Sequence, residues 1–184
     1  FNTFPIPPDF ATFWQQAVQQ GYKPKIAQIA KTGLFPSQVQ SLGPIGVNLA
    51  SGAYWTPTWP YKSSLTGVNC KDLGSGYESS SGKQWNQQLG PSLALFDVAA
   101  AVLKASGNPK DPQAVSKAMT TLSVDTPIGK LDWSKGPNAS VVATPIIGGQ
   151  WVNQSGSKFP LDFVLCENSS DPNVPVASKL IAYG

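Results

Sequence analysis

The sequence predicts an α/β fold in which helices cover a parallel sheet. Two observations lead there: apolar residues recur at helical spacing over several stretches, and short apolar strands separate those stretches up to about residue 55. Such alternation is typical of parallel sheets, because a parallel connection needs a crossover, usually a helix. With 184 residues and 41% hydrophobic content, the chain can form one domain or two small lobes with a real core.

The first third of the chain alternates between expected helices and strands. Phe10 and Trp14 recur at helical spacing, with Asp9 as the expected N-cap of their helix and Gly21 as its stop. This order continues the helix-to-strand alternation of a parallel sheet. The expected elements are a helix at 9–20, a strand at 26–30, a short helix at 36–42 and a strand at 47–54.

Residues 54–61, which we call the strap, carry two Trp and two Tyr between prolines. A proline fixes its own φ, removes a donor and pushes the preceding residue into an extended conformation, so Thr56 and Trp59 are expected to be extended. Large amphipathic rings on a stiff strap suit the wall of a ligand cleft. The alternative is an aromatic loop pinned on its own core.

Three helices and four strands are expected after the strap. Asp111 and Pro112 give the last helix an N-cap and a proline at its first position. Gly148-Gly149 has the composition of a two-residue hairpin turn, and a second loop is expected at 153–158. The expected helices are 63–81, a helix from 91 to a cap at Gly107, and 112–122; the expected strands are 128–133, 141–147, 150–152 and 161–166; the tail 168–184 is expected to lie along the surface.

Composition excludes several classes of function. The chain has no histidine, which removes the most common general base and metal ligand, and its ten carboxylates form no metal-binding or acid-pair pattern. We therefore expect neither an enzyme nor a cofactor or metal site. A net charge of +3 from scattered lysines offers nucleic acid no stripe of cations, and the longest apolar run is too short to span a membrane.

The surface composition favours an extracytoplasmic protein, because only 12% of the residues are charged and Ser, Gln, Asn, Gly and Pro are abundant. Cys70 and Cys166 are far apart in sequence and lack the spacing of zinc or redox sites, so a disulfide between them in an oxidising compartment is left open. The chain begins without an initiator Met, and we expect it to be a fragment or a processed product of a longer protein.

The candidate ligand-binding residues lie at the ends of the expected elements. In open α/β sheets, ligands bind beyond the carboxyl ends of strands and at helix N-termini, where free N–H groups are available. The alternative is structural: Phe4 packs on the first helix, Ser92 caps its own helix and Lys31 is solvated. The candidates are Phe4, Lys31, Thr32, Tyr54, Trp55, Trp59, Gln88, Leu89 and Ser92.

Eight short motifs, taken in order, resemble the solute-binding proteins of ABC importers. The family has the type I fold, includes the leucine/isoleucine/valine-binding proteins and is also described as extracellular ligand-binding receptors. The resemblance runs from Phe4 to about Cys166. The motifs are PPDFATFWQQA (7–17), GYKPK (21–25), YWTP (54–57), SSLTG (63–67), GKQW (82–85), ALFDVA (94–99), DTPIG (125–129) and TPIIGGQW (144–151).

For the fold, the resemblance implies three layers, a sheet with flanking helices, in two lobes that are joined by crossover strands and close around a solute. Family members are longer than this chain, which would be the C-terminal half and contain parts of both lobes. Residues 1–55 and 140–167 would belong to the second lobe, 56–139 to a hinge and the first lobe, and 168–184 to a C-terminal tail. The strap would be one hinge.

For function, the resemblance implies the solute-binding component of an ABC importer, which takes a small organic solute to a membrane permease and needs no cofactor. Phe4 matches the place where the family puts an aromatic ring over the ligand. Lys31 or Thr32 falls where amino-acid binders offer a carboxylate to the ligand's ammonium group. A lysine there attracts an anion instead, which favours a carboxylate-bearing or aromatic solute.

The resemblance also implies a periplasmic or extracellular location, with membrane association through the permease or a lipid anchor. A homodimer of the fragment is expected if missing sheet partners leave apolar surface exposed. Two other functions stay open: a sensor domain of the same fold that gates a kinase or channel, and a hydrolase that uses distant carboxylates.

Overall fold

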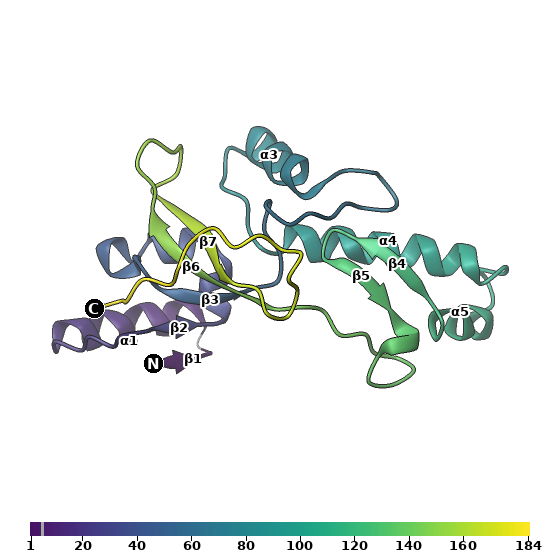
Figure 1. Ribbon diagram of the computed structural model, residues 1–184, viewed down its shortest axis with the longest axis horizontal. Helices are drawn as coiled ribbons and strands as arrows, with labels where there is room; N and C mark the ends of the chain where they lie inside the picture. Colours follow the sequence, from purple (N-terminus) through teal and green to yellow (C-terminus); the bar gives the residue numbers. More distant parts are fainter. Residues whose placement is uncertain (5) are drawn as a thin grey trace. The chain divides into compact units, whose positions relative to one another are not determined.

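The computed structural model describes residues 1–4 and 6–184 and has a mixed α/β fold with a central sheet and flanking helices, which confirms the predicted fold class (Figure 1). The α-helices are α1 Pro7–Gln19, α2 Pro36–Gln40, α3 Cys70–Ser81, α4 Leu89–Ala105 and α5 Pro112–Met119. The strands are β1 Asn2–Thr3, β2 Gln28–Ile29, β3 Ala50–Ala53, β4 Ser123–Thr126, β5 Gly129–Asp132, β6 Ile147–Asn153 and β7 Leu161–Glu167, and the 3-10 turns are η1 Lys31–Leu34, η2 Gly43–Gly46 and η3 Trp133–Lys135.

The chain forms two compact units. Unit 1 consists of Phe1–Ala53, Gly82–Gln87 and Ile146–Gly184, and unit 2 of Tyr54–Ser81 and Gln88–Pro145. The strap therefore begins where the chain first passes from unit 1 to unit 2. No helix in the described part of the chain is long and apolar enough to cross a membrane.

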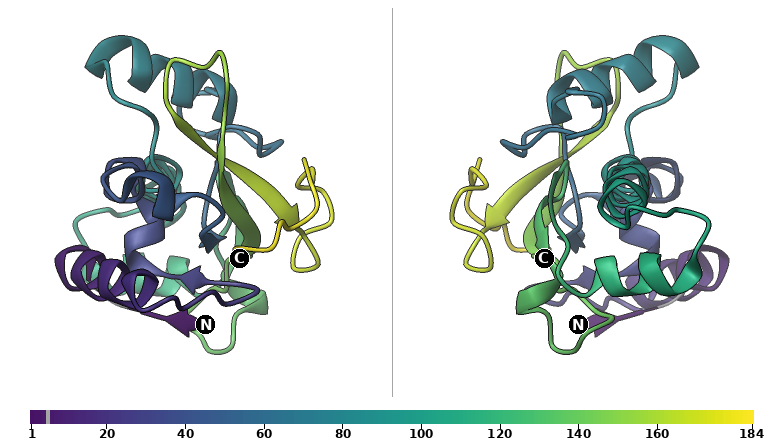
Figure 2. Two further views of the ribbon diagram at one scale, coloured as in Figure 1. Left: turned by 90° about the vertical axis from the view of Figure 1, so that its left-hand side faces the viewer. Right: turned by 90° about the vertical axis from the view of Figure 1, so that its right-hand side faces the viewer.

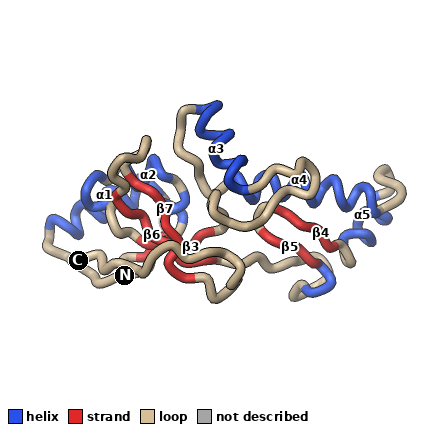
Figure 3. Tube along the Cα trace, turned by 45° about the horizontal axis from the view of Figure 1, so that its top comes forward, coloured by secondary structure: helices blue, strands red, loops and turns tan. Residues whose placement is uncertain are grey.

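Unit 1 is built on a five-stranded sheet in the order β1-β2-β3-β6-β7, drawn in red in Figure 3. Strands β1, β2 and β3 pair in parallel, as the alternation in the first third of the chain predicts, whereas β6 pairs antiparallel with both β3 and β7. Gly148 and Gly149 lie inside β6, opposite Gly52 and Ser51, and form no turn. A Cβ atom on Gly149 would lie 2.3 Å from the Phe163 ring, so this glycine makes room for a core side chain.

Helix α1 buries Phe10 and Trp14 against the rest of unit 1. Its end is the predicted one: Gly21 has a φ of +78°, and its N–H and the next one bond back to the carbonyls of Val18 and Ala17, as in a Schellman motif. Its start differs, because Pro7 and Pro8 occupy the first two helical positions and Asp9 lies within the first turn instead of capping it.

The C-terminal tail, drawn in yellow in Figure 2, is fastened to unit 1. The Gln150 side chain is buried in β6; its Nε2 donates to the Ile181 carbonyl at 2.7 Å, and its Oε1 accepts from the Ile181 N–H at 2.9 Å. Val174 has no exposed surface, and the Ala177 N–H bonds to the Leu165 carbonyl of β7. The tail thus contributes to the core of unit 1 as well as to its surface.

Unit 2 holds α3, α4, α5 and the hairpin β4–β5. The helix expected at 63–81 begins only at Cys70. The segment before it is a loop held by the buried carboxylate of Asp97 in α4, whose Oδ1 accepts from Ser63 Oγ at 2.6 Å and from the Leu65 N–H at 2.8 Å. Serine and threonine side chains that bond to nearby backbone compete with helix formation, and Ser63 Oγ does so with the Thr66 N–H.

The remaining elements of unit 2 follow the local signals in part. Asp111 caps α5 as predicted by accepting from the Gln113 N–H at 2.9 Å, and Gly107 after α4 has a φ of +66°. Helix α4 starts at Leu89, before the expected start, and α5 ends at Met119. Strand β4 was not predicted, and the strand expected at 141–147 is absent except for its last residue, the first of β6. Pro145 lacks an N–H, which disfavours ladder pairing just before β6.

Candidate ligand-binding groove

The first half of the strap is part of the core of unit 2. Trp55 has no exposed surface, and its indole Nε1 donates to the Cys70 Sγ at 3.1 Å. A helical glycine leaves room for the ring, because a Cβ atom on Gly90 of α4 would lie 2.2 Å from it. Gly74 of α3 makes room for Pro57 instead, since a Cβ atom there would lie 2.7 Å from the proline ring. This half of the strap therefore fits the alternative given above, an aromatic loop pinned on its own core.

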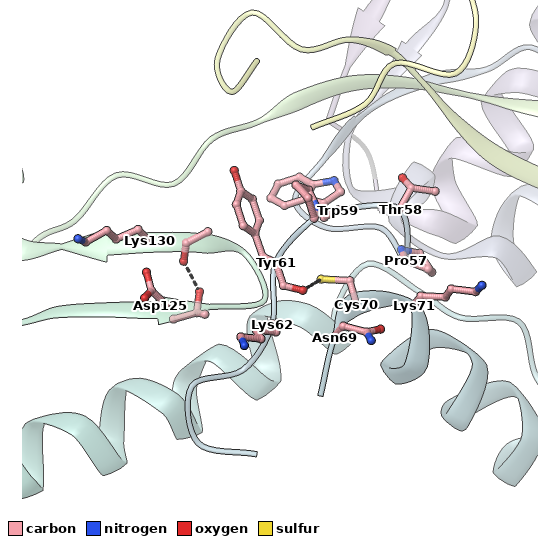
Figure 4. A pocket seen from close by; sticks show the side chains of 13 residues that line it. Pro57, Thr58, Trp59, Tyr61, Lys62, Asn69, Cys70, Lys71, Asp125 and Lys130 are labelled. Atoms are coloured by element: carbon pink, nitrogen blue, oxygen red, sulfur yellow. Dashed lines mark hydrogen bonds between the residues drawn. The ribbon is translucent and has the colours of Figure 1, made fainter. Parts of the chain in front are cut away.

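The second half of the strap is one wall of an open groove (Figure 4). The groove has a volume of about 800 Å³, within the range of small-molecule pockets. The Trp59 and Tyr61 rings meet edge to face, with centroids 6.2 Å apart and an interplanar angle of 76°. The other walls are the start of α3, at Asn69, Cys70 and Lys71, and the hairpin, at Asp125, Thr126, Gly129 and Lys130.

Short contacts fix the base of the groove. The buried Cys70 Sγ lies 3.3 Å from both the Tyr61 and the Pro127 carbonyl oxygens, which share its single S–H donor, and so joins the strap, α3 and the hairpin. Burial raises the pKa of this thiol above its ordinary value, which keeps it protonated. Gly129, at a φ of +97°, lies under the Tyr61 ring, and its carbonyl accepts from Thr126 Oγ1 at 2.7 Å.

The charges around the groove are mostly positive. Lys62 directly follows the strap, Lys71 lies in α3 and Lys130 lies in β5, and Asp125 is the acidic residue among the lining side chains. Within residues 1–4 and 6–184, none of these three lysines forms an ion pair. The Trp59 ring is 3% exposed, and its Nε1 has no hydrogen-bond partner in the described part of the chain. Residues 1–4 and 6–184 contain no cluster of His, Cys, Asp or Glu that could hold a metal ion.

The three candidates from unit 1 have different surroundings. Phe4 is 69% exposed, and Lys31 is exposed at the start of η1, so both side chains can meet a ligand. Thr32 in the same turn is buried. Whether these three residues contact a ligand stays a prediction.

The six candidates from unit 2 lie on the strap and on the first turns of α4. Tyr54 and Leu89 are half-buried, and Gln88 is the exposed residue just before α4. Ser92 is exposed within α4, where its N–H bonds to the Gln88 carbonyl, so it is not the start of the helix. Of the nine candidates, Trp59 lines the groove. Tyr61 also lines it and belongs to the strap, whose rings are predicted above to form a cleft wall. The groove residues of α3 and of the hairpin were not among the candidates, although the DTPIG motif marked the turn of the hairpin.

Both cysteines are free thiols, so the disulfide left open above is not formed. Cys70 is buried at the base of the groove, and Cys166 is half-buried in β7 with its Sγ 3.6 Å from Ser178 Oγ.

The sequence pattern of the family described as periplasmic binding protein matches residues 3–156. No curated protein sequence matches the chain. Similar solved structures include a leucine binding protein from Thermotoga maritima, with 14% identity, a TM-score of 0.64, and coverage of 87% of this chain and 42% of that one. An ABC transporter substrate-binding protein from Sphaerobacter thermophilus has 17% identity, a TM-score of 0.64, and coverage of 88% and 43%.

A third structure, an ABC transporter solute binding protein from Rhodopseudomonas palustris in complex with 3,4-dihydroxybenzoic acid, has 16% identity, a TM-score of 0.57, and coverage of 89% of this chain and 50% of that one. At such identities these likenesses show the type I fold alone. The chain spans half or less of the length of these three proteins.

Proposed function

Because this chain belongs to the periplasmic binding protein family, we propose that it is part of the extracytoplasmic solute-binding component of an ABC-type importer. The match over residues 3–156 carries the proposal. Under this proposal, unit 1 is a portion of the second lobe, unit 2 is a portion of the first lobe, and the strap is a hinge. The protein binds a small organic solute, leaves it chemically unchanged and delivers it to a permease.

The proposed ligand is amino-acid-like or a carboxylate-bearing or aromatic solute. Exposed Lys31 supports an anionic group on the ligand, and exposed Phe4 supports a ring or apolar part. The benzoate-type ligand of the Rhodopseudomonas palustris protein is compatible with this class. The proposed contacts are Phe4, Lys31, Thr32, Tyr54, Trp55, Trp59, Gln88, Leu89 and Ser92.

The proposed partners are the solute and a membrane permease. The proposed location is periplasmic or extracellular, with membrane association through the permease or a lipid anchor, and no cofactor takes part. Dimerisation of this chain stays a prediction. Sedimentation velocity, which reports the oligomeric state in solution, checks it.

A thermal-shift screen of the chain tests the proposal, because a ligand that binds only the folded state raises the melting temperature. The panel contains branched-chain amino acids, aromatic acids, dicarboxylates and uncharged amides. We expect a shift with at least one acid and recovery of that ligand unchanged by mass spectrometry. Lys31→Gln should reduce the shift, whereas Lys25→Gln, an exposed control in the same unit, should not. A panel without any shift, or conversion of a ligand to product, contradicts the proposal.

A further inference from the structure

We propose that the groove of unit 2 is a binding site in its own right for an organic anion that carries an aromatic ring. All of the residues that line it belong to unit 2, so this inference does not depend on a solute being held by unit 1. It assigns roles to Tyr61, Lys62, Lys71 and Lys130, none of which the family resemblance singled out.

The aromatic wall determines the apolar part of the ligand. Trp59 and Tyr61 are the aromatic residues that line the groove. Pro57 and Pro60 lie in the same wall. The edge-to-face contact of Trp59 and Tyr61 fixes both rings, and a planar ring can stack or pack edge-on against such a wall. The volume of about 800 Å³ admits a molecule of one or two fused rings.

The charge pattern determines the polar part of the ligand. Three lysines that form no ion pair within the described part of the chain, together with one aspartate, leave an excess of positive charge around one small groove. The lysines come from three different elements, so a bound anion can be approached from several sides. They form no linear run, which disfavours the regularly spaced phosphates of nucleic acid.

A donor without an acceptor lies in the same wall. The Trp59 indole N–H is almost completely buried and has no partner in residues 1–4 and 6–184. A buried donor of this kind is costly unless an acceptor satisfies it. A carboxylate oxygen, which the lysines also attract, is an acceptor of the kind that this donor lacks.

The site is also preorganised. The Cys70 thiol joins the backbone of the strap to the backbone of the hairpin through the Tyr61 and Pro127 carbonyls. Gly129 holds the hairpin turn directly under the Tyr61 ring. Fixed walls reduce the conformational entropy that is lost when a ligand binds.

The test is isothermal titration calorimetry of the chain with three probes. The probe 2-naphthoate has both ring and charge, 2-naphthamide has the ring alone, and inorganic phosphate has charge alone. We expect 2-naphthoate to bind at least tenfold more tightly than either of the others. Raising the salt concentration should weaken its binding, because the charges are close to solvent.

Matched lysine variants locate the site. The triple variant Lys62→Gln, Lys71→Gln and Lys130→Gln should lose at least tenfold in 2-naphthoate affinity. The control triple variant Lys104→Gln, Lys110→Gln and Lys117→Gln removes the same charge from exposed positions of unit 2 and should change affinity less than twofold. Far-ultraviolet circular dichroism confirms that both fold. In ¹⁵N-labelled chain, the indole signal that disappears in Trp59→Phe should be the one shifted by 2-naphthoate.

The groove site is overturned if 2-naphthoate does not bind at millimolar concentration, if 2-naphthamide binds equally well, or if both triple variants lose the same affinity. Loss of 2-naphthoate binding in Lys31→Gln instead of the groove triple variant would also overturn it, while leaving the proposed solute-binding function intact. Conversely, groove binding without any response to Lys31→Gln would support the inference even if the importer function failed.

Discussion

The two halves of the strap have similar sequences and opposite surroundings. Trp55 is enclosed between two helices, its ring fits against Gly90, and its N–H is bonded to Cys70. Trp59, four residues later, lines an open groove and has a buried N–H that finds no partner among residues 1–4 and 6–184. The same residue type therefore serves the core in one half and a candidate binding surface in the other.

This difference shows that hydrogen-bond satisfaction distinguishes the two roles better than burial does. Both rings are almost completely buried, at 0% and 3% exposure. Three buried tryptophans have acceptors for their N–H groups: Trp14 bonds to Ile45, Trp151 to Gly33, and Trp55 to Cys70. Trp59 departs from this pattern, and it is also the one of the four that lines the groove.

Trp55→Ala should have the largest effect, because it removes the ring around which α3, α4 and the strap pack. We expect a loss of about 3–5 kcal/mol in the free energy of unfolding, as for other large-to-small core changes. Urea unfolding followed by circular dichroism measures it. Trp133→Ala, at a half-buried position of the same unit, should cost clearly less. A loss below about 1 kcal/mol for Trp55→Ala would mean that Trp55 is not a core residue.

Local signals predicted much of the fold. The caps at Gly21 and Asp111 were correct, because each depends on backbone geometry set by a few neighbouring residues. Gly148-Gly149 was misread because a glycine pair has the same local preference in a turn as in a strand, and contact with Phe163 decides between them. Strand β4 was missed because Val124 is the one apolar residue among its four, whereas its order comes from pairing with β5 and from packing on α4.

The candidate site was less predictable than the fold. Trp59 was selected from its composition and its proline neighbours, which are local features. The groove also needs Tyr61 and Lys130, which lie far apart in sequence and meet only when the hairpin packs on the strap. No periodicity or motif spacing encodes that meeting, so the hairpin side of the groove could be found only from the structure.

Gly129→Ala tests the groove half of the comparison by disturbing the hairpin under Tyr61. At a φ of +97°, a side chain is strained, and its Cβ would lie 3.5 Å from the Tyr61 ring. We expect a loss of about 1–2 kcal/mol in the free energy of unfolding. Gly76→Ala, with open space around it in α3, should instead stabilise the chain by about 0.5–1 kcal/mol. Equal effects of the two substitutions would contradict the strained turn.

Alkaline unfolding tests the thiol that joins the two halves. Burial raises the pKa of Cys70 above 9.0, so its contribution to stability is present below that pH and is lost as the unfolded thiol ionises at higher pH. The slope for one thiol stays below about 1.4 kcal/mol per pH unit. Cys70→Ser should therefore show a flatter decline in melting temperature between pH 8 and pH 10 than the unsubstituted chain.

Tyr183 of unit 1 needs its own control in that experiment. Burial also raises the pKa of its hydroxyl above 10.0, so its contribution is lost at a still higher pH. Tyr183→Phe should change the melting curve mainly above pH 10. If Cys70→Ser and the unsubstituted chain decline in parallel, the thiol does not hold the groove as described.

Trp59→Phe should have the smallest effect on stability. Its comparison with Trp55→Phe separates the roles of the two tryptophans of the strap. The substitution removes buried ring area, which costs stability, and also removes a buried donor without an acceptor, which recovers it. We expect the free energy of unfolding to change by less than about 1 kcal/mol. Trp55→Phe removes similar ring area together with a satisfied hydrogen bond, and should cost about 2 kcal/mol. Equal losses in the two variants would show that the missing acceptor at Trp59 has no energetic consequence, and the two halves of the strap would then differ only in what surrounds them.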